Sequence, residues 1–194
     1  MLAIFLAPIY ILLNIYVLRW GYLWIGNCHH LFQSRIFRII LTVIYTLIAL
    51  TPLTGFLIRK PAFLHRILKI TSNYFLGIFM YILMVLFSID IVRLILKYAV
   101  HASWIQSRIV FAAVGACCIC IVIIISFLGI YHVKHIKVTP YKITVDKSAP
   151  DMDSLKIVLL ADTHFGYNSG AVHAQEIVDK INEQQPDLVC IAGD

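Results

Sequence analysis

The sequence predicts a multi-pass α-helical membrane domain with about four transmembrane helices, followed by the beginning of an α/β domain. The chain is 61% hydrophobic and only 13% charged, whereas soluble domains carry about 25% charged residues. The apolar excess ends near residue 131, and strand and helix patterns of ordinary soluble composition follow it. We therefore divide the 194 residues into a four-helix transmembrane domain at 1–132, a strand and linker at 133–154, and a βαβ segment at 155–194.

Four apolar runs are long enough to cross a bilayer, which takes about 20 mostly apolar residues. They cover residues 2–17, 36–58, 74–96 and 109–131. Pro8 and Pro52 interrupt the first two runs. Proline is tolerated in membrane helices because neighbouring groups can satisfy the carbonyls that it frees. We expect a kink at Pro52.

The positive charges are scattered between the apolar runs. The loop predicted between the second and third runs holds Arg59, Lys60, Arg66 and Lys69, and Lys134 and Lys137 follow the fourth run. By the positive-inside rule, this distribution favours a cytoplasmic tail. We expect an integral membrane protein. The net charge of +6 is explained by topology and lipid headgroups, and no nucleic-acid partner is expected.

Two groups of polar residues in the membrane domain have alternative interpretations. Asp90, in the third run, either pairs with Arg93 on the same helix face or belongs to a proton or substrate relay. Cys28, His29 and His30 are adjacent and could hold a metal, although no further ligand follows at a matching spacing. The cysteines of the fourth run, Cys117, Cys118 and Cys120, are interpreted as small apolar side chains.

The tail alternates between strand and helix patterns. Apolar and polar residues alternate over 136–145, which predicts a half-buried strand with a break at Pro140. Residues 156–161 form a short apolar strand, and residues 174–181 carry apolar side chains at helical spacing. A second buried strand is predicted at 188–192.

A strand–helix–strand unit of this kind makes the two strands parallel. Asp162, His164 and Asp194 follow the strands and are therefore expected to converge at the carboxyl ends, where open α/β sheets bind ligands. Two carboxylates and an imidazole suit a divalent metal ion, and a carboxylate can bridge two ions. Gly193 permits a close approach of the backbone.

The residues LKIVLLADTHFG, followed by PDLVCIAGD, resemble the opening of the calcineurin-like metallophosphoesterases. The arrangement of anchor, strand and tail resembles the membrane-anchored bacterial members, which implies a location in the bacterial cell membrane. The resemblance implies that Asp162 and His164 hold the first of two divalent metal ions, and that Asp194 bridges both. Mn, Fe, Zn and Mg are the candidate ions. In that family the metals activate water to attack a phosphomonoester or phosphodiester. The implied partners are the lipid bilayer and a phosphate-ester substrate that is lipid-linked or nucleotide-linked.

The resemblance covers residues 155–194 and predicts an incomplete α/β metallophosphoesterase domain. The family's later Asn-His and Gly-His-x-His motifs have no counterpart before Asp194. The catalytic histidine is therefore expected beyond the chain end, and the chain is expected to be inactive alone. His173 lies on the predicted crossover helix, and His132 and His135 lie beside the last membrane run, so none of the three replaces these motifs.

Two other functions remain open from the sequence. The helices themselves could act in transport or assembly, with a non-catalytic tail. The spans lack the paired charges and broken repeats that are typical of transporters. Alternatively, the tail could serve only as an interaction module.

Overall fold

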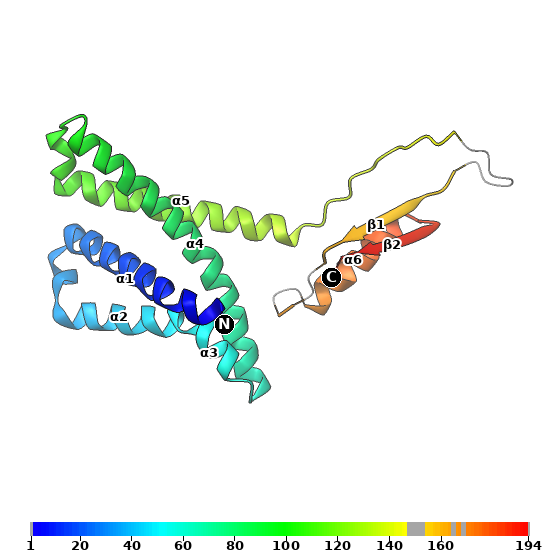
Figure 1. Cartoon of the computed structure of the whole chain (residues 1–194), viewed down its shortest axis with the longest axis horizontal. Helices are drawn as coiled ribbons and strands as arrows, with labels where there is room; N and C mark the ends of the chain where they lie inside the picture. Colours follow the sequence, from blue (N-terminus) through cyan, green and yellow to red (C-terminus); the bar gives the residue numbers. More distant parts are fainter. Residues whose placement is uncertain (1, 147–153, 164–165, 168–169, 194) are drawn as a thin grey trace. The chain divides into compact units, whose positions relative to one another are not determined.

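The computed structural model describes residues 2–146, 154–163, 166–167 and 170–193 (Figure 1). The chain divides into two compact units, Met1–Leu128 and Gly129–Asp194. The first unit contains helices and no strand among its described residues, and its last helix continues past the boundary to Lys134. The helices are, in order, α1 (Leu2–Cys28), η1 (His30–Gln33), α2 (Arg35–Ala49), α3 (Thr51–Leu57), α4 (Ala62–Tyr98), η2 (Ser103–Gln106) and α5 (Arg108–Lys134).

Helices α1, α4 and α5 are each long and apolar enough to cross a membrane, and α2 with α3 makes a fourth span if the bent pair crosses as one. Most of their large apolar side chains are exposed, as expected for helices that face lipid. A small core of Trp20, Leu86 and Cys118 joins α1, α4 and α5. Cys118 therefore serves as the small apolar side chain that was predicted.

Helices α1 and α4 are much longer than the apolar runs that predicted them. Helix α4 has 37 residues and begins at Ala62, so Arg66 and Lys69 lie in its first turns and the prediction that they occupy a loop was wrong. Likewise, α1 continues past Arg19 to Cys28. Helical backbone hydrogen bonds form within the segment and continue past the point where the side chains stop being apolar. Hydropathy marks the part that suits the bilayer and misses the rest.

The kink expected at Pro52 is confirmed. Helices α2 and α3 are bent by 45° at Leu50. Pro52 has no N–H for the carbonyl of Ile48, and the Thr51 hydroxyl donates to that carbonyl at 2.7 Å instead. The hydroxyl of Tyr10, on α1, donates to the carbonyl of Ala49 at 2.6 Å. Side chains therefore satisfy the carbonyls of both Ile48 and Ala49 at the bend, as a membrane interior requires.

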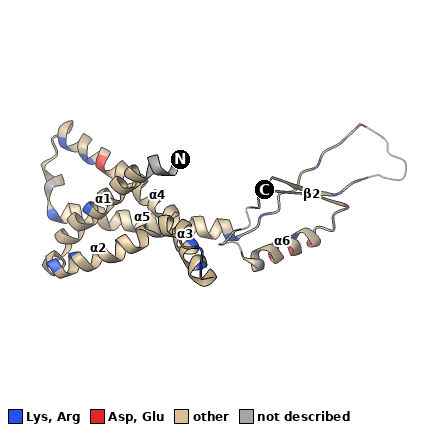
Figure 2. Ribbon diagram, turned by 60° about the horizontal axis from the view of Figure 1, so that its bottom comes forward, with Lys and Arg blue, Asp and Glu red and all other residues tan. Residues whose placement is uncertain are grey.

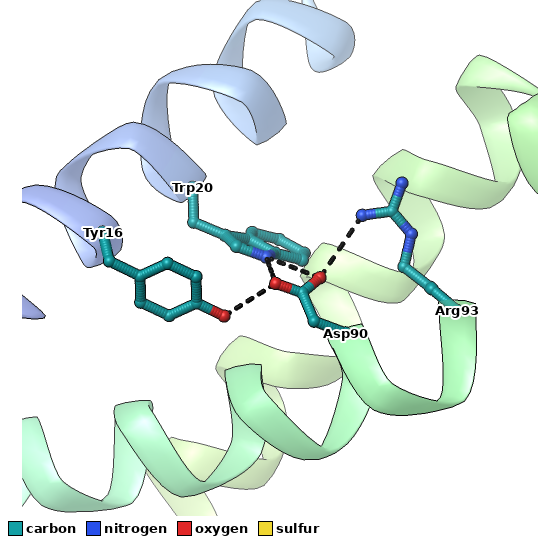
Figure 3. A network of polar contacts seen from close by, with 4 residues as sticks. All are labelled: Tyr16, Trp20, Asp90 and Arg93. Atoms are coloured by element: carbon teal, nitrogen blue, oxygen red, sulfur yellow. Dashed lines mark hydrogen bonds and ion pairs between the residues drawn. The ribbon is translucent and has the colours of Figure 1, made fainter. Parts of the chain in front are cut away.

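Asp90 forms a polar link between α1 and α4 (Figure 3). Its carboxylate accepts from the Tyr16 hydroxyl at 2.7 Å and from the Trp20 indole N–H at 3.2 Å. Arg93 Nη1 lies 3.5 Å from Asp90 Oδ1, which confirms the predicted ion pair. The Arg93 guanidinium also lies over the ring of Phe111, on α5, 4.7 Å from its centroid. The carboxylate thus has donors from two helices and a structural role.

The second unit contains the predicted strand–helix–strand pattern. Strand β1 (Ile157–Ala161), helix α6 (Ala171–Glu183) and strand β2 (Leu188–Ala192) follow one another, and β1 pairs with β2 in parallel. The predicted strand at 136–145 was wrong, because the described residues 135–146 contain no strand. A strand forms where a neighbouring strand completes its backbone hydrogen bonds, and among the described residues β1 and β2 pair only with each other.

Candidate metal centre at the strand ends

The register of the sheet brings the residues after β1 and β2 together. It runs from Ile157 opposite Leu188 to Ala161 opposite Ala192. The ladder continues one residue further, since the N–H of Asp162 donates to the carbonyl of Ala192 at 3.0 Å. Asp162 and the residue after Ala192 are therefore neighbours at the carboxyl edge of the sheet, where α/β folds bind ligands.

Both residues at this edge adopt left-handed backbone conformations. Asp162 has a φ of 48° and Gly193 a φ of 85°, a region that aspartate tolerates better than most residues and that glycine adopts without cost. A Cβ atom at Gly193 would overlap Oδ1 of the Asp162 carboxylate. Glycine at position 193 therefore provides the space in which the Asp162 side chain lies.

Asp162 is exposed, so its oxygens are available to a ligand. Carboxylate oxygens are preferred by hard and borderline divalent cations, and this part of the predicted ligand set fits a metal ion. His164 and Asp194, the other two predicted ligands, lie outside the described residues. In the described ranges, which omit these two, no group of three His, Cys, Asp or Glu side chains is placed to hold a metal.

Asp187, at the opposite end of the strands, was not singled out by the sequence analysis. Its Oδ2 accepts from the backbone N–H of Lys156 at 2.7 Å, and its own N–H donates to the Lys156 carbonyl at 2.9 Å. This two-way contact holds the start of β1 against the start of β2. The available signal was an aspartate immediately before an apolar strand, a residue type that often bonds nearby backbone groups.

His173 and His135 have local contacts on their own helices. His173 Nδ1 lies 3.6 Å from the Glu176 carboxylate within α6. His135 Nδ1 is 2.8 Å from the carbonyl of Tyr131, one turn earlier at the end of α5. Cys28 and His29, from the alternative site, belong to no metal-binding group within the described part of the chain, and the His30 side chain lies outside it.

Three curated proteins are similar to part of the chain. A zebrafish protein named transmembrane protein with metallophosphoesterase domain is 37% identical over 76 residues, which cover 37% of this chain and 17% of the relative. The protein of the same name from cattle is 40% identical over 57 residues, covering 29% and 13%. A metallophosphoesterase of Campylobacter jejuni is 36% identical over 74 residues, covering 37% and 20%.

These relatives confirm the resemblance to the metallophosphoesterase superfamily and to members that carry a membrane anchor. The chain spans a fifth or less of the length of the curated relatives that it matches. No protein-family model matches the chain. No solved structure matches it either. The relatives come from vertebrates and a bacterium, so the bacterial cell membrane stays a prediction.

Proposed function

We propose that this chain supplies the membrane anchor and the first metal-binding strands of a metal-dependent phosphoesterase. The observation that carries this proposal is the Asp162 carboxylate, which is exposed beside Gly193 at the carboxyl edge of two parallel strands. The names of the relatives, which combine a transmembrane part with a metallophosphoesterase domain, support the same function.

Asp162 would hold the first metal ion together with His164, and Asp194 would be shared between two ions. Two divalent cations bound at this edge supply an activated water and neutralise charge on the phosphoryl oxygens. The chain's own contribution is to orient the first carboxylate. The hydrogen bond from Asp162 N–H to Ala192 and the space left by Gly193 keep that carboxylate at the strand ends.

The membrane anchor limits where the substrate can be. Helix α5 ends at Lys134 and β1 begins at Ile157, so 22 residues connect them, and these can span at most about 80 Å when fully extended. A catalytic domain on this tether stays close to the bilayer, so its effective concentration toward substrates at the membrane surface is high. We therefore propose a phosphomonoester or phosphodiester that is lipid-linked or nucleotide-linked and meets the enzyme at the membrane.

The test is Asp162→Asn in the full-length protein. Hydrolysis of bis(p-nitrophenyl) phosphate with added Mn²⁺ should fall more than about 100-fold, because losing a ligand costs more than losing a residue that only orients one. Bound Mn²⁺ should fall in parallel. Asp179→Asn is the matched control, since Asp179 lies on α6 and accepts from Gln175 at 2.9 Å. Unchanged hydrolysis and metal content in Asp162→Asn would support a function of the helices alone.

A further inference from the structure

The turn between α3 and α4 gathers cations without an acidic neighbour in the sequence. Arg59 and Lys60 lie in the turn, and Arg66 and Lys69 follow in the first turns of α4. Figure 2 colours these cations blue where α3 meets α4. Residues 1–128 contain ten Lys and Arg residues but a single acidic one, Asp90, which already has partners on α1 and α4. The turn therefore carries uncompensated positive charge.

Packing between α3 and α4 holds these cations at one end of the helix pair. Lys69 Nζ lies over the ring of Phe56, on α3, 3.9 Å from its centroid. His65 Nδ1, on α4, is 2.8 Å from the carbonyl of Ile58, at the end of α3. Cations from the turn and from the first turns of α4 are thus brought close together.

The amino-terminal end of α4 adds to the positive potential. Pro61 is its N-cap residue, no side chain caps it, and its first turn holds no acidic residue. The free N–H groups and the dipole of a long helix favour an anion at this position. The N-terminus of α2 differs, because the Ser34 side chain accepts from the Phe37 N–H at 3.3 Å.

Large apolar side chains surround the same turn. Phe56, Leu57 and Phe63 are 72%, 80% and 75% exposed. Apolar surface that is left in water costs about 25 cal/mol per Å². The boundary between lipid headgroups and acyl chains, in contrast, accommodates aromatic and apolar side chains next to cations. A small soluble anion would use the charges and leave these side chains without a partner.

We propose that the α3–α4 turn binds the headgroup of an anionic phospholipid. The lipid phosphate pairs with Arg59, Lys60 and Arg66 at the N-terminus of α4. The acyl chains lie against the exposed Leu57 and Phe63. This site is independent of the phosphoesterase function proposed above and requires neither metal nor substrate.

The test compares two pairs of substitutions in the full chain, reconstituted in phosphatidylcholine nanodiscs with a minor fraction of phosphatidylglycerol. Native mass spectrometry of the released protein measures the bound phosphatidylglycerol relative to phosphatidylcholine. Arg59→Gln with Arg66→Gln should lower this preference about 25-fold, since each cation near an anionic surface contributes about a fivefold effect. Arg35→Gln with Arg38→Gln is the control, because these exposed arginines lie at the capped N-terminus of α2.

An equal loss of phosphatidylglycerol preference in both pairs would overturn the proposal, because it would reflect net charge alone. An unchanged preference in the Arg59→Gln and Arg66→Gln pair would also overturn it. Arg59→Lys with Arg66→Lys keeps the charges and should retain the preference. Excess inorganic phosphate should leave the bound lipid unchanged. If phosphate displaced the lipid, the ligand would be a free anion, and the assignment to a phospholipid would be wrong.

Discussion

The backbone N–H of Asp162 donates to the carbonyl of Ala192 at 3.0 Å, one residue beyond the paired strands. This bond places the first predicted metal ligand next to Gly193, whose missing side chain leaves room for the carboxylate. The edge that ligands use in parallel α/β sheets is thus formed by local contacts between two five-residue strands.

Gly193→Ala should displace the Asp162 carboxylate and weaken metal binding. The new Cβ would overlap Oδ1 of Asp162, and a φ of 85° costs a non-glycine residue about 1–2 kcal/mol. Mn²⁺ affinity, measured by equilibrium dialysis on the full-length protein, should fall by at least about tenfold. Gly170→Ala is the control, because nothing lies within 4 Å of a Cβ there. Equal affinity in both variants would contradict the role assigned to Gly193.

Asp187→Ala should loosen the pairing of β1 with β2. The substitution leaves the Lys156 N–H without the carboxylate that accepts from it at 2.7 Å; because Lys156 is exposed to water, the loss is about 0.5–1.5 kcal/mol. Hydrogen exchange of the amides of residues 157–161 should become faster. In Asp179→Ala, which removes an exposed carboxylate from α6, exchange in β1 should keep its original rate. Slow exchange in both variants would show that Asp187 does not hold the register.

Asp90→Ala should destabilise the helical unit by about 1–2 kcal/mol, the upper range for polar contacts within membranes. Tyr16, Trp20 and Arg93 would all lose their shared acceptor. Unfolding in mixed micelles with increasing dodecyl sulfate measures the loss. Ser88→Ala is the control, because its hydroxyl donates only within α4, to the Met84 carbonyl.

A double-mutant cycle with Asp90→Asn and Tyr16→Phe tests the link between α1 and α4 separately. The two side chains are joined by a hydrogen bond of 2.7 Å, so their effects on the free energy of unfolding should be non-additive by about 0.5 kcal/mol or more. Additive effects would mean that the two residues act independently.

Pro52→Ala should straighten the bend between α2 and α3. Alanine restores the N–H that Pro52 lacks, so the carbonyl of Ile48 can accept a helical hydrogen bond in place of the one from Thr51. Spin labels at Ile40 and Phe56, on either side of the 45° bend, should move apart in pulsed dipolar measurements. Pro8→Ala is the control, since Pro8 lies inside the continuous helix α1. An unchanged distance would assign the bend to packing.

Several features of this protein followed from the sequence because they depend on local patterns. Long apolar runs predicted the helices, and Pro52 predicted the bend. Residues 188–192 match β2 as the structure has it, because the strand–helix–strand pattern that predicted this strand also supplies its parallel partner, β1. The Asp90–Arg93 pair followed from three-residue spacing on a helix. The assignments of Asp162, His164 and Asp194 as metal ligands stay predictions.

Other features were decided only by tertiary structure, because they depend on residues far apart in the sequence. The two donors from α1 to Asp90 lie 74 and 70 residues away from it, and no spacing rule connects them. The contact of Asp187 with Lys156 requires the strands to be paired. The alternation at 136–145 predicted a strand and was wrong, because a strand also needs a partner. The sequence thus determined which segments are helix and strand, and the packing between them determined which polar groups meet.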